Sequence, residues 1–295
     1  MTGFNKVLVA FGSDPLDGSL LLALRELARA PGLAEVHAVT VHRDTGEAAA
    51  PQRFAERLEK EVRHALEGVA APAIVTAVLD GPVLDALLAY LERHTVDLAI
   101  VGHRRTDRSR SLARRLARHA PCSILMVPDG APPRFGHVLV PVDFSRTSTR
   151  TLDAALSLCK ALGLSECHAL NVISRSDRAH QDEEPLPPGM ERAAIERMMT
   201  HDEPREVALR FEIEDADDVA AGVHAVATRL STGLICMGAR GRSRAAAVLL
   251  GSATEDVLER VGCPVLVVRD PGRPLSLLDV LVQRVFTEED RPRPI

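Results

Sequence analysis

Residues 234–238 read Leu-Ile-Cys-Met-Gly, and the chain continues with Ala239-Arg240-Gly241 and, after nine intervening residues, Gly251-Ser252. The four apolar residues before Gly238 have the length of a buried strand, and the glycine bounds it. From Ser252 the pattern Ser-x-x-Glu is a capping box that predicts a helix start, and the helix continues with an apolar stripe at Val257, Leu258 and Val261. The stretch is therefore expected to form a strand, a glycine-containing loop and a helix.

This combination is chemically suited to an anion. Glycines let the backbone approach an anion closely, and a helix start offers unpaired N–H groups at the positive end of the helix dipole. The residues also allow a plainer interpretation, in which Gly238 ends a strand, Gly241 makes a turn and Ser252 is an ordinary N-cap. Short glycine motifs by themselves do not decide between the two.

The predicted strand is one element of a repeat that runs through the whole chain. The matching segments keep their order, while the offset between them grows from 131 to 136 and then 141 residues. These increases place insertions in loops of the second copy. The matched segments are Val7–Ala10 with Val138–Pro141, Glu35–Val41 with Glu166–Val172, Asp97–Gly102 with Gly233–Gly238, and Cys122–Val127 with Cys263–Val268.

Each copy alternates short apolar strands with helices. The pattern predicts an α/β fold with two tandem doubly wound domains, each a five-stranded parallel sheet covered by helices on both faces and joined by right-handed crossovers. In the second copy we expect strands near 137–142, 166–173, 206–213, 233–237 and 264–268, and helices near 147–162, 189–201, 216–230 and 252–261.

The composition shifts of the chain predict its domain boundaries. Residues 1–129 form the first domain, the Gly- and Pro-rich residues 130–136 a linker, and residues 137–270 the second domain. The tail, 271–295, contains a candidate amphipathic helix from Leu275 to Phe286 that is expected to pack on a domain or a partner subunit.

The composition excludes several classes of protein. With 295 residues and 46% hydrophobic content the chain can fill two cores, and it has neither an apolar run of membrane-spanning length nor the pattern of a signal peptide at Met1. We therefore expect a soluble cytoplasmic protein without membrane contact. A net charge of −5 argues against general nucleic-acid binding. The five cysteines lack metal-ligand spacing and are expected to be buried reduced thiols, so no metal held by side chains is expected.

The repeat, Asp143 at the end of the first strand of the second copy, and the spacing Gly238-x2-Gly241-x9-Gly251-Ser252 together resemble a tandem universal stress protein. The resemblance covers about residues 4–270. It implies a fold of the adenine-nucleotide alpha-hydrolase type, and the glycine spacing resembles the ATP-binding subgroup of the family. It also implies that the last strands, here Ile124–Val127 and Val265–Val268, pair across a pseudo-two-fold axis inside the chain. A homodimer of the whole chain stays open.

The resemblance also implies roles for individual residues. Asp143 would contact the adenosine part of ATP, Val172 would lie against adenine, and Gly238, Gly241, Gly251 and Ser252 would hold the phosphates together with Mg²⁺ or Mn²⁺. An independent argument points to the same edge, because ligands of open parallel sheets bind beyond the carboxyl ends of the strands where the strand order reverses. Taken alone, Asp143 is equally well explained as a turn-former or cap.

The first copy departs from this pattern. Gly12 stands in place of Asp143, Arg105 in place of Gly241, and Arg110-Ser111 in place of Gly251-Ser252, so that Gly102 and Ser111 alone remain. A side chain at a former glycine position would crowd a phosphate. We therefore expect ATP in the second domain and none in the first.

Seven arginines follow Gly102 within fifteen residues, namely Arg104, Arg105, Arg108, Arg110, Arg114, Arg115 and Arg118. Guanidinium groups suit phosphates and acidic partners, but charge runs are usually solvated helix faces with some ion pairing, and that interpretation is favoured. No aromatic residue interleaves with them, which weakens a role in single-stranded nucleic-acid binding.

The favoured function is a nucleotide-binding stress-response protein in which ATP acts as a signal for conformation or for the choice of a protein partner. The alternatives are a slow ATPase or nucleotidyl-transfer enzyme, and a scaffold with an empty site. An enzyme is less favoured because the sequence has no Walker motif and no recognisable general base.

Overall fold

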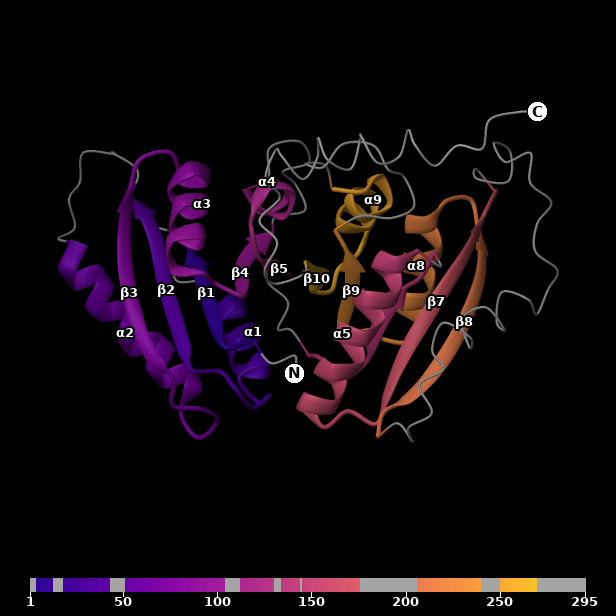
Figure 1. Cartoon of the computed structure of the whole chain (residues 1–295), viewed down its shortest axis with the longest axis horizontal. Coiled ribbons are helices and arrows are strands. Elements are labelled where there is room, and N and C mark those ends of the chain that lie inside the picture. The colour runs from indigo at the N-terminus through magenta and orange to yellow at the C-terminus, as the bar shows by residue number, and fades with distance from the viewer. Residues whose placement is uncertain are drawn as a thin grey trace, which may run out of the picture.

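The computed structural model describes residues 4–12, 18–42, 51–103, 112–129, 134–143, 145–175, 206–239 and 250–269. Within these ranges the two halves of the chain form two α/β domains that lie side by side (Figure 1). The expected helix near 189–201 and the expected tail helix from Leu275 to Phe286 lie outside the described residues.

The elements of the first domain alternate as the repeat predicts. They are β1 (Lys6–Phe11), α1 (Gly18–Leu27), β2 (Glu35–His42), α2 (Pro51–Leu66), β3 (Ala73–Asp80), α3 (Val83–His94), β4 (Leu98–His103), α4 (Leu112–His119) and β5 (Ser123–Pro128). Those described in the second domain are β6 (Val138–Pro141), α5 (Arg146–Leu162), β7 (Glu166–Ser174), β8 (Ala208–Ala216), α8 (Val219–Arg229), β9 (Leu234–Gly238), α9 (Ser252–Arg260) and β10 (Val265–Val268).

All ten described strands belong to one sheet. Their order is β3-β2-β1-β4-β5-β10-β9-β6-β7-β8, so each domain has its strands in the order 3-2-1-4-5 and the two fifth strands meet in the middle. Pairing is parallel inside each domain and antiparallel between β5 and β10, where Leu125 lies opposite Leu266. The doubly wound fold and the pairing of the last strands are thereby confirmed.

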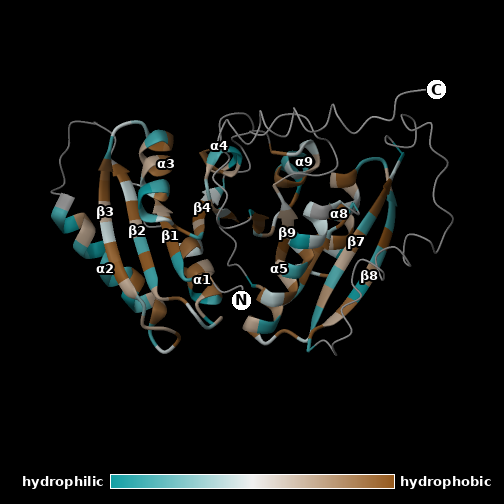
Figure 2. Ribbon diagram, in the orientation of Figure 1, coloured by the Kyte–Doolittle hydropathy of each residue, from teal (hydrophilic) through white to brown (hydrophobic). Residues whose placement is uncertain are grey.

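Helices cover both faces of this sheet. One face packs against α1, α2 and α5, and the other against α3, α4, α8 and α9. On each face the buried apolar side chains form a cluster that continues from one domain into the other. The central strands β4, β5 and β9 are buried almost throughout, whereas β8 at the end of the sheet alternates exposed and half-buried residues, as its alternating colours show (Figure 2). This is the pattern expected for buried parallel strands and for an edge strand.

Two glycines of the second domain allow elements to approach closely. A Cβ at Gly222 of α8 would lie 2.6 Å from Cγ1 of Val172 on β7, and a Cβ at Gly233 would lie 1.4 Å from the carbonyl oxygen of Arg134. Gly233 also donates its N–H to the carbonyl of His137 at 2.9 Å, which fixes the start of β9 beside the start of β6. No side chain fits at either position without movement of its neighbours.

Helix starts are capped where the sequence offers short polar residues. Ser145 caps α5 by accepting a hydrogen bond from the Ser148 N–H, and Asp218 caps α8 by accepting one from the Ala221 N–H at 2.7 Å. The prediction that Ser252 caps its helix is wrong by one residue. Gly251 has the extended backbone of the N-cap, with φ −63° and ψ 142°, and Ser252 is the first helical residue.

Candidate functional site

The carboxyl ends of β6 and β9 lie side by side where the strand order reverses. The two strands are parallel neighbours, with Leu139 opposite Ile235, so the residues that follow each strand reach the same edge of the sheet. Asp143 comes two residues after the end of β6, and Gly238 is the last residue of β9. The structure therefore places both at the position that open α/β sheets use for ligands.

Asp143 is half-buried and begins the turn into α5. Its Oδ1 accepts a hydrogen bond from the Ser145 N–H at 3.1 Å, so it has the turn-forming role that the sequence left open as an alternative. The preceding residue is held by a side chain that the sequence analysis did not single out. Asn171 on β7 is buried and its Nδ2 donates to the Val142 carbonyl at 2.9 Å. A polar residue within the apolar run Ala169–Val172 was the available signal.

The start of α9 is joined directly to the end of β9. The Gly251 N–H donates to the Ala239 carbonyl at 3.1 Å, and the hydroxyl of Thr254 donates to the Gly238 carbonyl at 3.2 Å. No described side chain caps this end of the helix. Since the first N–H groups of a helix have no partners within it, α9 directs hydrogen-bond donors and the positive end of its dipole toward this edge.

Ser252 is exposed and is the first residue of this turn. Gly251 has a φ of −63°, which residues other than glycine adopt readily. What glycine contributes there is the absence of a side chain beside the helix N-terminus rather than an unusual backbone angle.

Val172 lies near the carboxyl end of β7, the strand next to β6. Continuing the pairing of Pro141 with Leu170 places Val172 level with Asp143. Its side chain is half-buried, packs with the apolar cluster under α8 and α9, and lies against Gly222. The structure thus brings Asp143, Val172, Gly238, Gly251 and Ser252 to one edge of the second domain, while Gly241 lies outside the described residues.

The first domain repeats part of this geometry. Thr40 on β2 takes the place of Asn171, and its hydroxyl donates to the Phe11 carbonyl at 3.2 Å, as Asn171 does to Val142. Gly12 follows β1 where Asp143 follows β6, and a Cβ at Gly12 would meet nothing within 4 Å. The other differing positions, Arg105, Arg110 and Ser111, lie outside the described residues.

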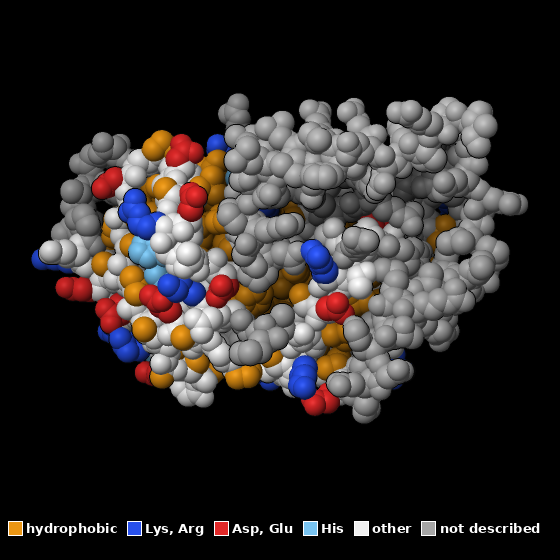
Figure 3. All heavy atoms as spheres, viewed as in Figure 1, with side chains coloured by type: hydrophobic (Ala, Val, Ile, Leu, Met, Phe, Trp, Pro, Cys, Tyr) orange, Lys and Arg blue, Asp and Glu red, His pale blue; other side chains and the backbone are white. Residues whose placement is uncertain are grey.

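Two of the clustered arginines contact the second domain. Nη1 of Arg114 lies 2.7 Å from Oε1 of Glu259, and Nε of Arg118 lies 2.8 Å from Oε1 of Glu255, so that α4 and α9 are joined by two ion pairs. These arginines therefore have a structural role, in agreement with the interpretation as an ion-paired helix face. Over the first domain in Figure 3, blue basic and red acidic side chains are interspersed. Arg104, Arg105, Arg108 and Arg110 lie outside the described residues.

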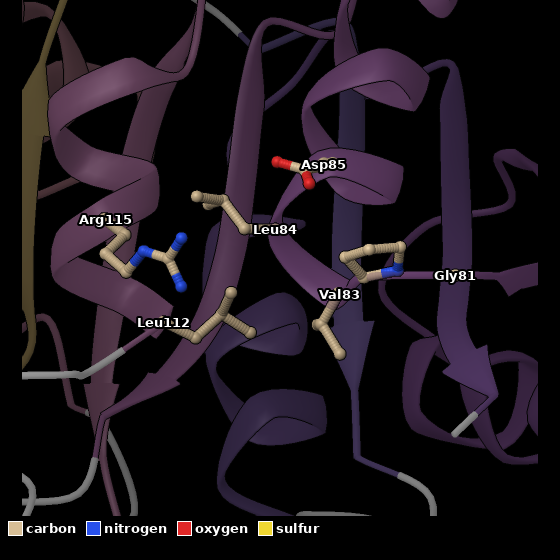
Figure 4. A pocket seen from close by; sticks show the side chains of 7 residues that line it. Gly81, Val83, Leu84, Asp85, Leu112 and Arg115 are labelled. Carbon is tan, nitrogen blue, oxygen red and sulfur yellow. The ribbon is translucent and has the colours of Figure 1, made fainter. Parts of the chain in front are cut away.

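Arg115, the arginine between them, lines a pocket of about 340 Å³ in the first domain (Figure 4). The pocket opens between the starts of α3 and α4 and is lined by Gly81, Pro82, Val83, Leu84, Asp85, Leu112 and Arg115. It combines apolar walls with one acidic and one basic side chain, and it lies beyond the carboxyl end of β3. Nothing in the sequence had indicated it.

The five cysteines carry free thiols, as predicted. Burial raises the pKa of Cys122 to about 12 and that of Cys263 to about 11, and it also raises the pKa of Cys236. A raised pKa keeps a thiol protonated and unreactive near neutral pH. Four of the cysteines are buried in the core, and Cys263 is partly buried and packs against it.

Comparison with known protein families identifies the repeated domain that builds the long sheet. A model of the universal stress protein family matches the chain twice, over residues 3–128 and 134–269. The chain belongs to the universal stress protein family. The tandem arrangement inferred from the sequence is confirmed, whereas the assignment of the second domain to the ATP-binding subgroup stays a prediction.

Solved structures of universal stress proteins share this fold. One from Archaeoglobus fulgidus has a TM-score of 0.64 at 17% identity and covers 91% of this chain and 98% of that chain. Another, from Pseudomonas aeruginosa, has a TM-score of 0.64 at 18% identity and covers 90% of this chain and 94% of that chain. A search of curated protein sequences found no match. Among the described residues, no helix is long and apolar enough to cross a membrane.

Proposed function

We propose that the second domain binds ATP and that the bound nucleotide acts as a signal in a stress response. The proposal rests on one observation: where the strand order reverses, the start of α9, which no described side chain caps, is hydrogen-bonded to the end of β9 beside Asp143. A helix N-terminus of this kind attracts phosphate, and Gly251 leaves room for it to approach.

The other candidate residues fit the remaining parts of the nucleotide. The carboxylate of Asp143 is of the type that accepts hydrogen bonds from ribose hydroxyls, and the apolar side chain of Val172 suits an adenine face. Ser252 adds a hydroxyl donor next to the phosphate position. Gly238 ends β9, and Gly241 belongs to the sequence that connects β9 with α9; neither has a side chain that would crowd the phosphates. Mg²⁺ or Mn²⁺ would be held chiefly by the phosphate oxygens and would neutralise part of their charge.

A binding function can regulate only through a difference in affinity between two states of the protein. The joint between the domains offers a route for such a difference, because α9 carries the proposed phosphate site at its N-terminus and the partners of Arg114 and Arg118 along its length. ATP would then bias the contact of α9 with α4, and through it the surface presented to a protein partner.

The test is binding of ATP to the full chain, with Mg²⁺ present. We expect one ATP per chain by calorimetry, and ATP in the natively purified protein by mass spectrometry. Gly251→Arg, which copies the first domain, should weaken binding at least tenfold, and Ser252→Ala should weaken it severalfold because one donor is lost.

Gly12→Ala in the first domain is the matched control, because that position is open and lies at the equivalent edge. It should leave ATP affinity unchanged. Absence of both co-purified nucleotide and ATP binding by the wild type would overturn the proposal. Multiple turnover of ATP that Gly251→Arg abolishes would instead assign the site to an enzyme.

A further inference from the structure

A second cluster of chemically active side chains lies at the opposite edge of the second domain, at the amino ends of the strands. His137 precedes β6, Glu166 begins β7, and His168 is two residues further along β7. Because Leu139 pairs with His168 and side chains alternate along a strand, the three lie on the same face of the sheet. One donor atom from each lies within 4.8 Å of the others.

His168 has no hydrogen bond at either ring nitrogen within the described part of the chain, although only 7% of its surface is exposed. Its Nε2 lies 3.5 Å from Oε1 of Glu166, and its Nδ1 lies 3.5 Å from Oε1 of Glu212 on β8. Each ring nitrogen thus faces a carboxylate oxygen at a separation longer than an ordinary hydrogen bond, and a buried imidazole held in this way needs an explanation. Two ligands of one tetrahedral Zn²⁺ ion, with bonds of about 2.1 Å, stand about 3.4 Å apart, which is the separation found here between Nε2 and Oε1.

The carboxylates around His168 are themselves held by arginines. Nε of Arg210 lies 3.2 Å from Oε2 of Glu166, and Nη2 of Arg229 lies 3.1 Å from Oε2 of Glu212. Each arginine occupies one carboxylate oxygen and leaves Oε1 directed toward the imidazole. Metal-bound histidines typically donate their second N–H to a carboxylate, and Glu212 stands at Nδ1 in that position.

At the equivalent place in the first domain, the ammonium group of a lysine side chain lies next to the glutamate. Lys6 stands where the second domain has His137, and its Nζ lies 3.0 Å from Oε2 of Glu35, the counterpart of Glu166. The counterpart of His168 is His37, whose Nδ1 is hydrogen-bonded to the Tyr90 hydroxyl at 2.8 Å. The second domain has Val226 in place of that tyrosine. It has therefore lost both the lysine cation and the phenol, and it has gained a metal-ligating residue.

We infer that His137, Glu166 and His168 bind a divalent transition-metal ion of the Zn²⁺ type. Imidazole and carboxylate are ordinary Zn²⁺ ligands, and two histidines with one glutamate leave a fourth position for water. His137 is exposed, so that position is open to solvent. The ion would fasten the residue before β6 to β7. Cysteine spacing could not reveal this site, because the ligands come together only through the pairing of β6 with β7.

The test uses the full chain after treatment with a chelator, titrated with Zn²⁺ in competition with a chromophoric chelator. We expect one tight Zn²⁺ per chain, a rise in melting temperature on loading, and a tetrahedral Co²⁺ absorption spectrum when Co²⁺ replaces Zn²⁺. His137→Ala and Glu166→Gln should each weaken Zn²⁺ binding at least tenfold, and His137→Lys, which copies the first domain, should abolish both the binding and the thermal shift.

His224→Ala is the matched control, because His224 is exposed on α8 and is not among the proposed ligands. It should bind Zn²⁺ as the wild type does. Since His137 is exposed, its variants are expected to fold even if Glu166→Gln does not. Unchanged Zn²⁺ affinity in His137→Lys, or no tight binding by the wild type, would overturn the inference.

Discussion

Arg114 of the first domain and Glu259 of the second form an ion pair whose Nη1 and Oε1 atoms lie 2.7 Å apart, with 11% of the arginine side chain exposed. A second ion pair, Arg118–Glu255, joins the same two helices. In the repeat, Arg114 occupies the position of Glu255, and Arg118 occupies the position of Glu259. The two helices thus meet like the equivalent faces of a dimer, with the charges of one copy reversed.

Arg114→Ala should lower the free energy of unfolding by about 1–2 kcal/mol, because it removes a nearly buried side chain from between the two domains together with its ion pair to the exposed Glu259. Urea unfolding measures this change. Arg115→Ala on the same helix is the control, since Arg115 is exposed, and it should change stability by less than about 0.5 kcal/mol. Equal effects of the two substitutions would contradict a specific role of the pair.

Gly233→Ala should be strongly destabilising, by about 3 kcal/mol or more, because the added methyl group would meet a backbone carbonyl that cannot move without shifting the start of β6. Thermal and urea unfolding of the purified variant test this. Gly136→Ala, close to Gly233 in space but with open space around its own Cβ position, should be nearly neutral. A stable Gly233→Ala protein would show that the contact with Arg134 is not maintained in solution.

Gly222→Ala sets two effects against each other. Alanine favours a helix by about 1 kcal/mol over glycine, but its Cβ would collide with both γ carbons of Val172, a residue with little χ1 freedom. We expect a net loss of about 1 kcal/mol in unfolding free energy. In the double variant Gly222→Ala/Val172→Ala the clash is absent, so the unfolding free energy lost through it should be regained. The double-mutant cycle measures this free energy. Additive effects would mean that the two residues do not touch.

The helix cap at Asp218 makes stability depend on pH. Its hydrogen bond from the Ala221 N–H, and then its pairing with Arg260, hold the pKa of this carboxyl below its ordinary value of 3.8. A lowered folded-state pKa means that the contribution is complete above the unfolded value and is lost as the pH falls below 3.8 toward the folded value.

Asp218→Asn isolates this effect, because asparagine also caps helices but carries no charge. The wild type should be more stable than Asp218→Asn near pH 6, and the difference should shrink as the pH falls below 3.8. Urea unfolding across that range measures it. Asp218→Ala should lose about 1 kcal/mol more at every pH. A difference between wild type and Asp218→Asn that stays constant with pH would contradict the assignment.

The cysteines give a chemical test of burial. At pH 8 the native protein should react with a thiol-specific disulfide reagent only slowly, because the pKa values of Cys122 and Cys263 lie near 12 and 11 and the thiolates are scarce. After unfolding in guanidinium chloride all five thiols should react at once. Rapid labelling of one or more cysteines in the native state would show that the fold opens locally there.

The repeated sequence allowed the doubly wound fold to be predicted, because apolar strands of fixed spacing leave few ways to wind a parallel sheet. The edge that carries the candidate site followed from the rule that ligands bind beyond the carboxyl ends of parallel strands, where Asp143 and Gly238 stand. The N-cap of α9 was placed one residue late, at Ser252, since Gly251 adopts an N-cap backbone that a Ser-x-x-Glu pattern does not reveal.

Contacts that depend on three-dimensional packing were missed. Asn171 and Thr254 hold the site edge through single side-chain bonds to carbonyls of Val142 and Gly238, which no spacing rule identifies. The pairing between α4 and α9 did leave a signal, because residues of opposite charge stand at equivalent places in the two copies. Comparing the copies residue by residue would have found it.

Because β5 and β10 belong to one chain, the two domains associate in an intramolecular step whose equilibrium does not depend on protein concentration. Dilution cannot separate the partners, so the melting temperature should not vary with protein concentration so long as no larger assembly forms. The pairing of β5 with β10 also covers the strand edge through which a single domain could add further strands to its sheet. Among the described strands the free edges of the sheet are β3 and β8, so an assembly that extends this sheet by strand pairing would use one of them.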